Sequence, residues 1–227
     1  MTLFRTALLS GLVLALSSVT APARPGAQDT PAGRAASKPM VTLQMPALPA
    51  PVPVTLNPKT TAVLVLDYVV PICDSQPKCK DAMLPAMLPF MARVRKAGMV
   101  VAYGTLEENM TKWLPELAPK PGDIKIVCTA QDRFYNTDLD KDLKAKGITT
   151  IIMAGWKVSG SVAYSSVGAT VRGYTGVIPV DTTAATTDYE QMIGFYNILN
   201  QRGGNLTNQP LKPQAPTLSR TDMITFQ

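Results

Sequence analysis

The chain of 227 residues contains no histidine. This absence excludes catalytic triads built on histidine and every histidine-based metal site, so we expect neither a cofactor nor a bound metal. Charge is also scarce, because only 17% of the residues are charged and no dense run of Lys and Arg occurs. Residues 1–27 hold two arginines and no acid, which leaves 20 basic against 16 acidic residues, or +4. Such a mild excess argues against a nucleic-acid partner.

The N-terminus has the pattern of a secretory signal peptide. Arg5 precedes an apolar stretch at residues 7–16, and small residues follow, with Ala27 at the preferred cleavage position. A transmembrane anchor is the alternative, but the stretch is shorter than the ~20 residues that a bilayer requires. We therefore expect residues 1–27 to be removed, leaving a periplasmic or secreted protein with no stable membrane insertion.

The chain has only three cysteines. Cys73 and Cys79 enclose the short segment CDSQPKC, and Cys128 stands apart. In an oxidising compartment the first two can form a disulfide, and two unpaired loop thiols are the alternative.

Residues 28–58 are rich in Pro and Ala, which predicts a tether and an extended lead-in to a single domain at residues 59–227. Apolar runs then alternate with helical patterns, which is typical of a parallel sheet. We predict a three-layer, Rossmann-like α/β domain, with about six parallel strands and helices on both faces. The expected strands are residues 62–66, 99–103, 124–127, 149–153, 176–180 and 223–226, and the expected helices are residues 83–96, 139–146, 161–172 and 189–199.

Ligands of such sheets bind outside the carboxyl ends of the strands. Asp67, the segment after Val127 and the turn at residues 155–161 are all predicted to lie at that edge.

Three segments with matching spacing resemble the isochorismatase-like cysteine hydrolases, which include isochorismatases, nicotinamidases and N-carbamoyl amide hydrolases. In VLVLDYVV, Asp67 matches the catalytic aspartate of that family. The segment around residues 122–148 is similar to the family's strand and Phe-x-x-Thr-x-Leu turn, through Phe134, Thr137 and Leu139. A third segment, residues 151–181, follows the family's nucleophile region from Gly155 onward. The resemblance covers roughly residues 55–226.

This chain departs from the family pattern at two positions that matter for catalysis. The nucleophilic cysteine falls on Ser161 and the catalytic lysine falls on Cys128, so that only Asp67 remains of the triad. Serine has a far higher pKa than cysteine and would need a strong base within hydrogen-bond reach, and the chain has no histidine to serve as that base. Lys157-Val158 would match the family's cis peptide beside the oxyanion hole. Nicotinamidases also carry an Asp/His metal site, for which this chain has no histidine.

The resemblance implies catalytic positions at Asp67, Cys128 and Ser161, and substrate-binding positions at Tyr135, Trp156, Lys157 and Val158. Each has a simpler interpretation. Asp67 would cap a turn, Ser161 would cap a helix, Cys128 would pack in the core, Lys157 would be solvated, and Tyr135 and Trp156 would be packing residues.

Two functions stay open at this point. The first is a pseudoenzyme that binds a small molecule, and the alternative is a hydrolase of a small amide that uses Ser161 or Cys128 with Asp67, with Lys157 as an unusual base. A homo-oligomer is compatible with both.

Overall fold

The computed structural model describes residues 42, 44–201 and 203–227, so the expected signal peptide lies outside the described residues. A compact unit comprises Pro46–Gln227. None of the described helices is long and apolar enough to cross a membrane.

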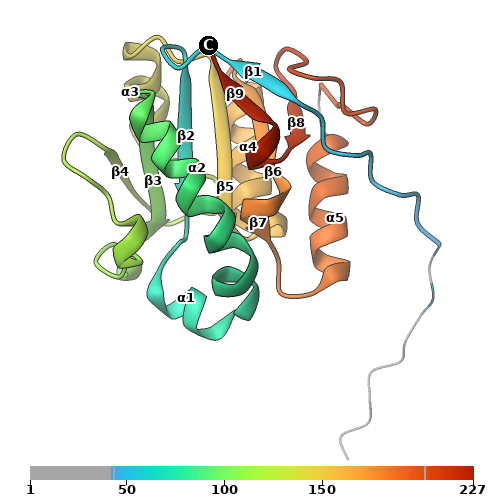
Figure 1. Ribbon diagram of the computed structural model, residues 1–227, viewed down its shortest axis with the longest axis horizontal. Coiled ribbons are helices and arrows are strands. Elements are labelled where there is room, and N and C mark those ends of the chain that lie inside the picture. Colours follow the sequence, from blue (N-terminus) through green and yellow to red (C-terminus); the bar gives the residue numbers. More distant parts are fainter. Residues whose placement is uncertain (1–41, 43, 202) are drawn as a thin grey trace, which may run out of the picture. The chain divides into compact units, whose positions relative to one another are not determined.

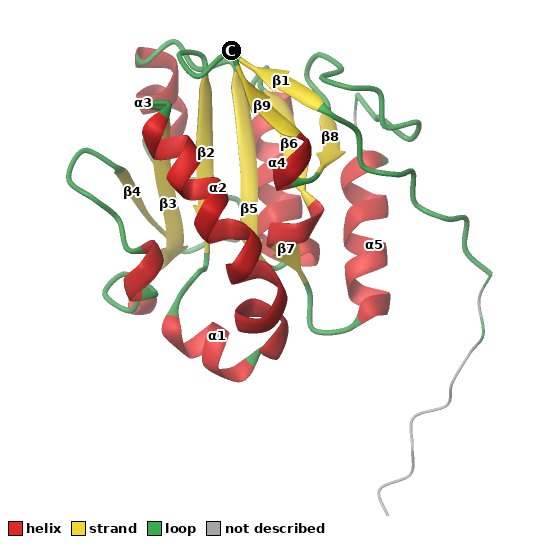
Figure 2. Ribbon diagram, viewed as in Figure 1, coloured by secondary structure: helices red, strands yellow, loops and turns green. Residues whose placement is uncertain are grey.

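The main sheet is parallel and confirms the predicted fold class (Figures 1 and 2). A short strand, β7 (Thr183–Ala184), pairs with the end of β5. The other strands follow one another across the sheet in the order β4 (Ile124–Cys128), β3 (Val100–Leu106), β2 (Thr61–Leu66), β5 (Thr150–Trp156), β6 (Thr175–Pro179) and β8 (Pro216–Ser219).

Helices cover both faces of this sheet (Figure 1). Strand β2 is buried along its whole length because its alternate side chains enter two separate cores. Val63 and Val65 pack with the α2 face, whereas Leu64 and Leu66 pack with α3, α4 and α5. The helices are α1 (Val70–Ser75), α2 (Leu84–Lys96), α3 (Leu139–Ala145), α4 (Ala163–Val171) and α5 (Asp188–Leu199).

Helix α2 illustrates how the sequence pattern produces these layers. Met87, Phe90, Met91 and Val94 recur at helical spacing and are all buried. The helix stops before Gly98, whose φ of 66° is strained for residues with a side chain.

Short helical turns connect the main elements. Two are π-helical, at Cys79–Met83 and Val158–Val162, and they extend the helices expected at residues 83–96 and 161–172 toward the N-terminus. Four are 3-10 turns, at Glu107–Asn109, Pro115–Leu117, Val180–Thr182 and Thr221–Met223.

The strand predicted at residues 223–226 does form, but it does not belong to the main sheet. The segment expected at residues 223–226 forms β9 (Ile224–Phe226), which pairs with β1 (Val54–Leu56) in a separate two-stranded parallel sheet. The sixth strand of the main sheet is instead β8, which was not expected. It has only four residues and begins with Pro216, so its sequence lacks the apolar run that identifies the other strands.

The predicted disulfide between Cys73 and Cys79 is confirmed, with the two Cα atoms 5.0 Å apart, and Cys128 is a free, buried cysteine. The pair does not lie in a loop, however, because Cys73 belongs to α1 and Cys79 begins the following π-turn.

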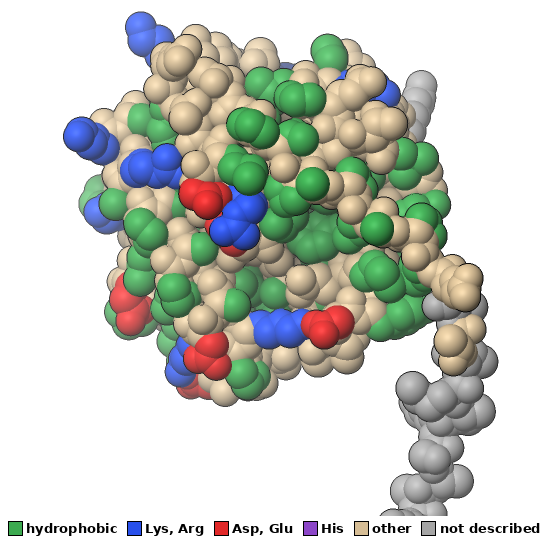
Figure 3. All heavy atoms as spheres, turned by 45° about the vertical axis from the view of Figure 1, so that its right-hand side comes forward, with side chains coloured by type: hydrophobic (Ala, Val, Ile, Leu, Met, Phe, Trp, Pro, Cys, Tyr) green, Lys and Arg blue, Asp and Glu red, His purple; other side chains and the backbone are tan. Residues whose placement is uncertain are grey.

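The surface carries charges of both signs. On the face shown in Figure 3, Lys and Arg side chains are scattered, and several lie beside acidic ones.

Candidate functional site

Asp67 directly follows β2 at the carboxyl edge of the sheet and is buried. Its φ of 54° turns the chain sharply at this point, and its backbone nitrogen donates to the carbonyl of Gly104 at 3.1 Å. The hydroxyl of Thr105 donates to Asp67 Oδ1 at 2.7 Å. The carboxylate is thus held in one orientation by β3, the neighbouring strand.

Ser161 approaches Asp67 from the π-turn that precedes α4. Its hydroxyl donates to Asp67 Oδ2 at 2.7 Å. The close approach of β5 to β2 requires Gly155, where a Cβ atom would lie 1.9 Å from the carbonyl oxygen of Leu66. The cis peptide joins Trp156 to Lys157, one residue earlier than the Lys157-Val158 position that the family pattern suggested.

Arg133 is the principal residue of this site that the sequence analysis missed. Its guanidinium donates to Asp67 Oδ2 at 2.6 Å and to Ser161 Oγ at 2.9 Å. The second terminal nitrogen donates to Cys128 Sγ at 2.8 Å and to the Ala130 carbonyl at 2.8 Å. With only 1% of its surface exposed, this side chain joins all three expected catalytic positions into one buried cluster.

The backbone around Arg133 makes room for this arrangement. Gly104 faces the arginine stem, since a Cβ atom there would lie 3.0 Å from Arg133 Cγ. The Arg133 amide donates to Ser165 Oγ on α4 at 3.2 Å. Gly168, one turn further along α4, faces Asp132, whose carboxylate would be 2.2 Å from a Cβ atom. The loop between β4 and α3 is therefore fixed against α4.

Cys128 ends β4 and is only 4% exposed. Burial raises the pKa of its thiol, and this effect outweighs the guanidinium of Arg133, which acts in the opposite direction. The thiol also has a carbonyl acceptor, the oxygen of Thr105 at 3.6 Å. Cys128 is accordingly a neutral thiol, unlike the thiolate that a nucleophilic cysteine requires.

The four expected substrate-binding residues do not form one group. Tyr135 is 55% exposed, on the loop after β4. Trp156 and Val158 are buried in the two different cores, on opposite faces of the sheet. Lys157 forms an ion pair with Glu190 of α5, which also accepts from Ser159 and whose pKa is lowered by these contacts.

A cavity of about 410 Å³ is lined by residues of the loop that carries Arg133 and by one residue of α4. Two exposed aromatic side chains, Tyr135 and Tyr164, contribute to its wall. The other lining residues are Ala130, Gln131 and Asp132.

The cluster contains a serine hydroxyl, a carboxylate and a guanidinium in mutual contact. The serine proton has an acceptor in Asp67, but accepting it would cost that carboxylate its ion pair with Arg133. These three side chains and that of Cys128 are all buried, so an incoming carbonyl group has little access to Ser161.

Comparisons with known proteins agree with this architecture. Residues 61–209 match the model of the isochorismatase domain family. The chain is 30% identical over 114 residues to the ureidoacrylate amidohydrolase of Stutzerimonas stutzeri, covering 50% of this chain and 45% of that protein. Identity to the ureidoacrylate amidohydrolase of Agrobacterium fabrum is 31% over 114 residues, covering 50% and 49%. The chain thus spans about half the length of the curated relatives it matches.

Solved structures show the same fold at low sequence identity. N-carbamoylsarcosine amidase from Thermoplasma acidophilum has a TM-score of 0.59 and 20% identity, covering 72% of this chain and 97% of that one. The nicotinamidase of Staphylococcus aureus also has a TM-score of 0.59, at 17% identity, covering 64% and 97%. Because the family model matches well over half of the sequence on this shared fold, the chain belongs to the isochorismatase family.

Proposed function

We propose that this chain is an exported member of the isochorismatase family that binds a small molecule and lacks the thiol-dependent hydrolysis of its relatives. The observation that carries the proposal is the Arg133 cluster. Its guanidinium occupies the hydrogen-bonding positions of Asp67, Ser161 and Cys128 at once.

The cluster is better suited to stability than to turnover. A nucleophile must be ionised as it attacks, and the general base must be free to take its proton. Here Asp67 is ion-paired, Ser161 donates to it, and the Cys128 thiol is neutral. The cation of Arg133 is held by these groups instead of facing a substrate.

The cavity beside the cluster is the proposed place for the ligand. Tyr135 and Tyr164 offer flat aromatic surfaces, and Gln131 and Asp132 offer hydrogen-bonding groups at the same opening. Curated relatives are named for ureidoacrylate and a structural neighbour for N-carbamoylsarcosine. We therefore infer a small planar ligand with a ureido or N-carbamoyl group.

A second candidate function, hydrolysis with Ser161 as nucleophile, has one observation in its favour. The Ser161 hydroxyl lies within hydrogen-bond distance of both a carboxylate and a cation, at 2.7 and 2.9 Å. In this alternative Asp67 would take the serine proton and Arg133 would stabilise the developing negative charge.

Purified protein tested against a panel of ureido and N-carbamoyl acids separates the two candidates. We expect no turnover above that of Ser161→Ala, together with binding by calorimetry that weakens in Tyr135→Ala and Tyr164→Ala. Tyr189→Ala removes an equally exposed tyrosine from α5 and serves as the control. Turnover that Ser161→Ala abolishes and Tyr189→Ala retains would establish the serine hydrolase instead.

Export has an independent test. N-terminal sequencing of the mature protein should give a chain that begins after Ala27, recovered from outside the cytoplasm. A full-length chain that stays with the cytoplasmic fraction would contradict this part of the proposal.

A further inference from the structure

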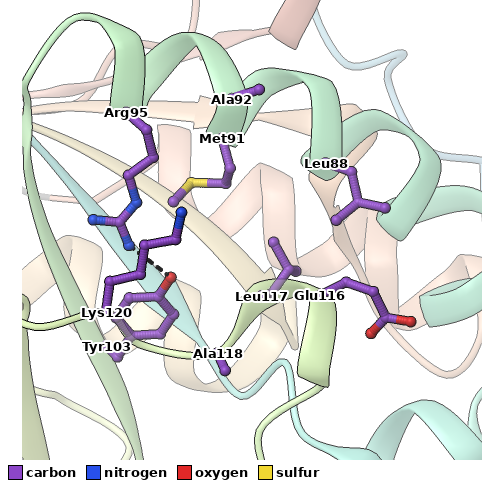
Figure 4. Close-up of a pocket in the computed structure, with 9 residues that line it drawn as sticks. All are labelled: Leu88, Met91, Ala92, Arg95, Tyr103, Glu116, Leu117, Ala118 and Lys120. Carbon is purple, nitrogen blue, oxygen red and sulfur yellow. Dashed lines mark hydrogen bonds between the residues drawn. The ribbon is translucent and has the colours of Figure 1, made fainter.

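A second cavity, of about 210 Å³, lies on the α2 face of the sheet (Figure 4). It is distinct from the Arg133 cluster, because Tyr103 in its wall belongs to the core on the α2 side, whereas Cys128 belongs to the opposite core. Its lining residues are Leu88, Met91, Ala92, Arg95, Tyr103, Glu116, Leu117, Ala118 and Lys120.

One end of the cavity is polar and already organised. Arg95 forms a two-pronged ion pair with Asp123 and donates to the Tyr103 hydroxyl at 3.2 Å. Burial raises the pKa of Tyr103, so this hydroxyl keeps its proton. Within the described part of the chain, no acceptor receives that proton, so the hydroxyl can donate to a ligand.

Lys120 supplies a positive charge at the same end. Figure 4 shows its ammonium group beside the side chains of Arg95 and Tyr103. Asp123 accepts from the Lys120 backbone amide, but its carboxylate is engaged with Arg95. No acidic group among the described residues lies within ion-pair distance of the Lys120 ammonium. The charge of Arg95 is thus balanced and that of Lys120 is free to attract an anion.

The rest of the wall is apolar. Leu88, Met91 and Arg95 recur on one face of α2, and the seven-residue interval from Leu88 to Arg95 corresponds to about 10 Å of helix. Leu117 closes the opposite side. Glu116 lies at the far end from Lys120, and its carboxylate points away from the basic group (Figure 4).

We propose that this cavity binds a small aliphatic monocarboxylate, independently of any ligand at the Arg133 cluster. The carboxylate lies against the Lys120 ammonium and the Tyr103 hydroxyl, and the aliphatic chain lies along Met91 and Leu117. The negative charge of Glu116 disfavours a second carboxylate at the far end.

The size of the cavity supports a ligand of this class. Pockets for drug-sized molecules have volumes of roughly 300 Å³ or more, so a cavity of about 210 Å³ suits a shorter molecule. Pentanoate has one carboxylate and a four-carbon chain, which matches both the polar end and the apolar wall.

Calorimetric titration with pentanoate tests the proposal on the whole mature protein, at concentrations up to roughly 10 mM because so small a ligand binds weakly. We expect binding that becomes about tenfold weaker in Lys120→Ala and in Tyr103→Phe. Lys96→Ala is the matched control, since this exposed lysine next to Arg95 lies outside the cavity. Pentylamine should not bind.

Glutarate, which carries carboxylates at both ends, tests the role of Glu116. We expect glutarate to bind more weakly than pentanoate to the wild type, and about equally well to Glu116→Gln. Absence of pentanoate binding, or equal binding by wild type, Lys120→Ala and Tyr103→Phe, would overturn the proposal. Tight binding of pentylamine would overturn it as well.

Discussion

The guanidinium of Arg133 and the carboxylate of Asp67 lie 2.6 Å apart, and both side chains are buried. The two residues are far apart in the sequence, on the loop after β4 and at the end of β2. Removing one partner of a buried ion pair leaves the other charge without compensation, which costs more than the intact pair contributes.

We therefore expect Asp67→Asn and Arg133→Met each to lower the free energy of unfolding by about 3–5 kcal/mol. The double variant should lose less than the sum of the two, because neither charge is then left alone. Urea denaturation measures all three. Arg220→Met, at the exposed ion pair with Asp222, should change stability by less than about 0.5 kcal/mol. Additive losses in the double variant would show that the two side chains are not coupled.

Gly104→Ala tests the fit of the arginine stem. The new methyl group would lie 3.0 Å from Arg133 Cγ, closer than a relaxed contact. We expect a loss of about 1–3 kcal/mol in the wild type, and little loss when Arg133 is already alanine. Thermal unfolding of the four proteins in this cycle gives the coupling, and an equal loss in both backgrounds would contradict it.

Cys128 should resist alkylation in the folded protein. At about pH 8, iodoacetamide should modify no thiol until denaturant is added, and then one per chain, because the raised pKa and the burial both suppress the thiolate. Mass spectrometry counts the adducts. Rapid modification without denaturant would show that the Cys128 thiol is accessible and reactive, and would support its role as a nucleophile.

The raised pKa of Cys128 also makes the free energy of unfolding depend on pH. Since the folded pKa exceeds the unfolded value of ~8.5, the unfolded thiol ionises first. The contribution of Cys128 to stability is therefore complete below that pH and is lost as the pH rises beyond it. Cys128→Ala should flatten this alkaline decline.

Reducing the Cys73–Cys79 disulfide should lower the free energy of unfolding by about 2 kcal/mol, because so short a loop restrains the unfolded chain only modestly. Denaturation with and without a reductant measures the difference. Free thiols at both positions in protein purified without a reductant would contradict the pairing.

Rebuilding the family's triad requires a substitution at Arg133 as well as at Ser161 and Cys128. Ser161→Cys with Cys128→Lys would place a lysine beside the buried guanidinium of Arg133, and we expect this variant to be unstable. Adding Arg133→Gln removes the competing cation. In the triple variant the thiol at position 161 should react with iodoacetamide well below the ordinary thiol pKa of ~8.5. Ordinary reactivity there would show that the lysine does not reach it.

The sequence predicted those features that depend on local patterns. The apolar run before Asp67 indicated a strand buried on both faces, and the parallel topology then placed Asp67, Cys128 and Ser161 at one edge. Arg133 could not be found in this way, since its partners Asp67 and Ser161 are distant in sequence and nothing in the local pattern marks a single arginine as buried. Gly104 on β3 leaves space for the Arg133 side chain, but this role can be recognised only once the structure places the loop against β3. Strands β1 and β8 were missed because each is short, and because β1 follows Pro53 and β8 begins with Pro216.

The pairing of β1 with β9 also affects the order in which the fold can form. Residues 54–56 find their partner only in residues 224–226, nearly the full length of the domain away. During synthesis, β1 stays unpaired until almost every other element has been made, because β9 follows them in the chain. Contacts this distant slow folding, because a long loop must close before they form. The pairing of β9 with β1 is therefore expected late in folding. In a nascent chain halted before Ile224, the backbone of Val54–Leu56 would lack its strand partner.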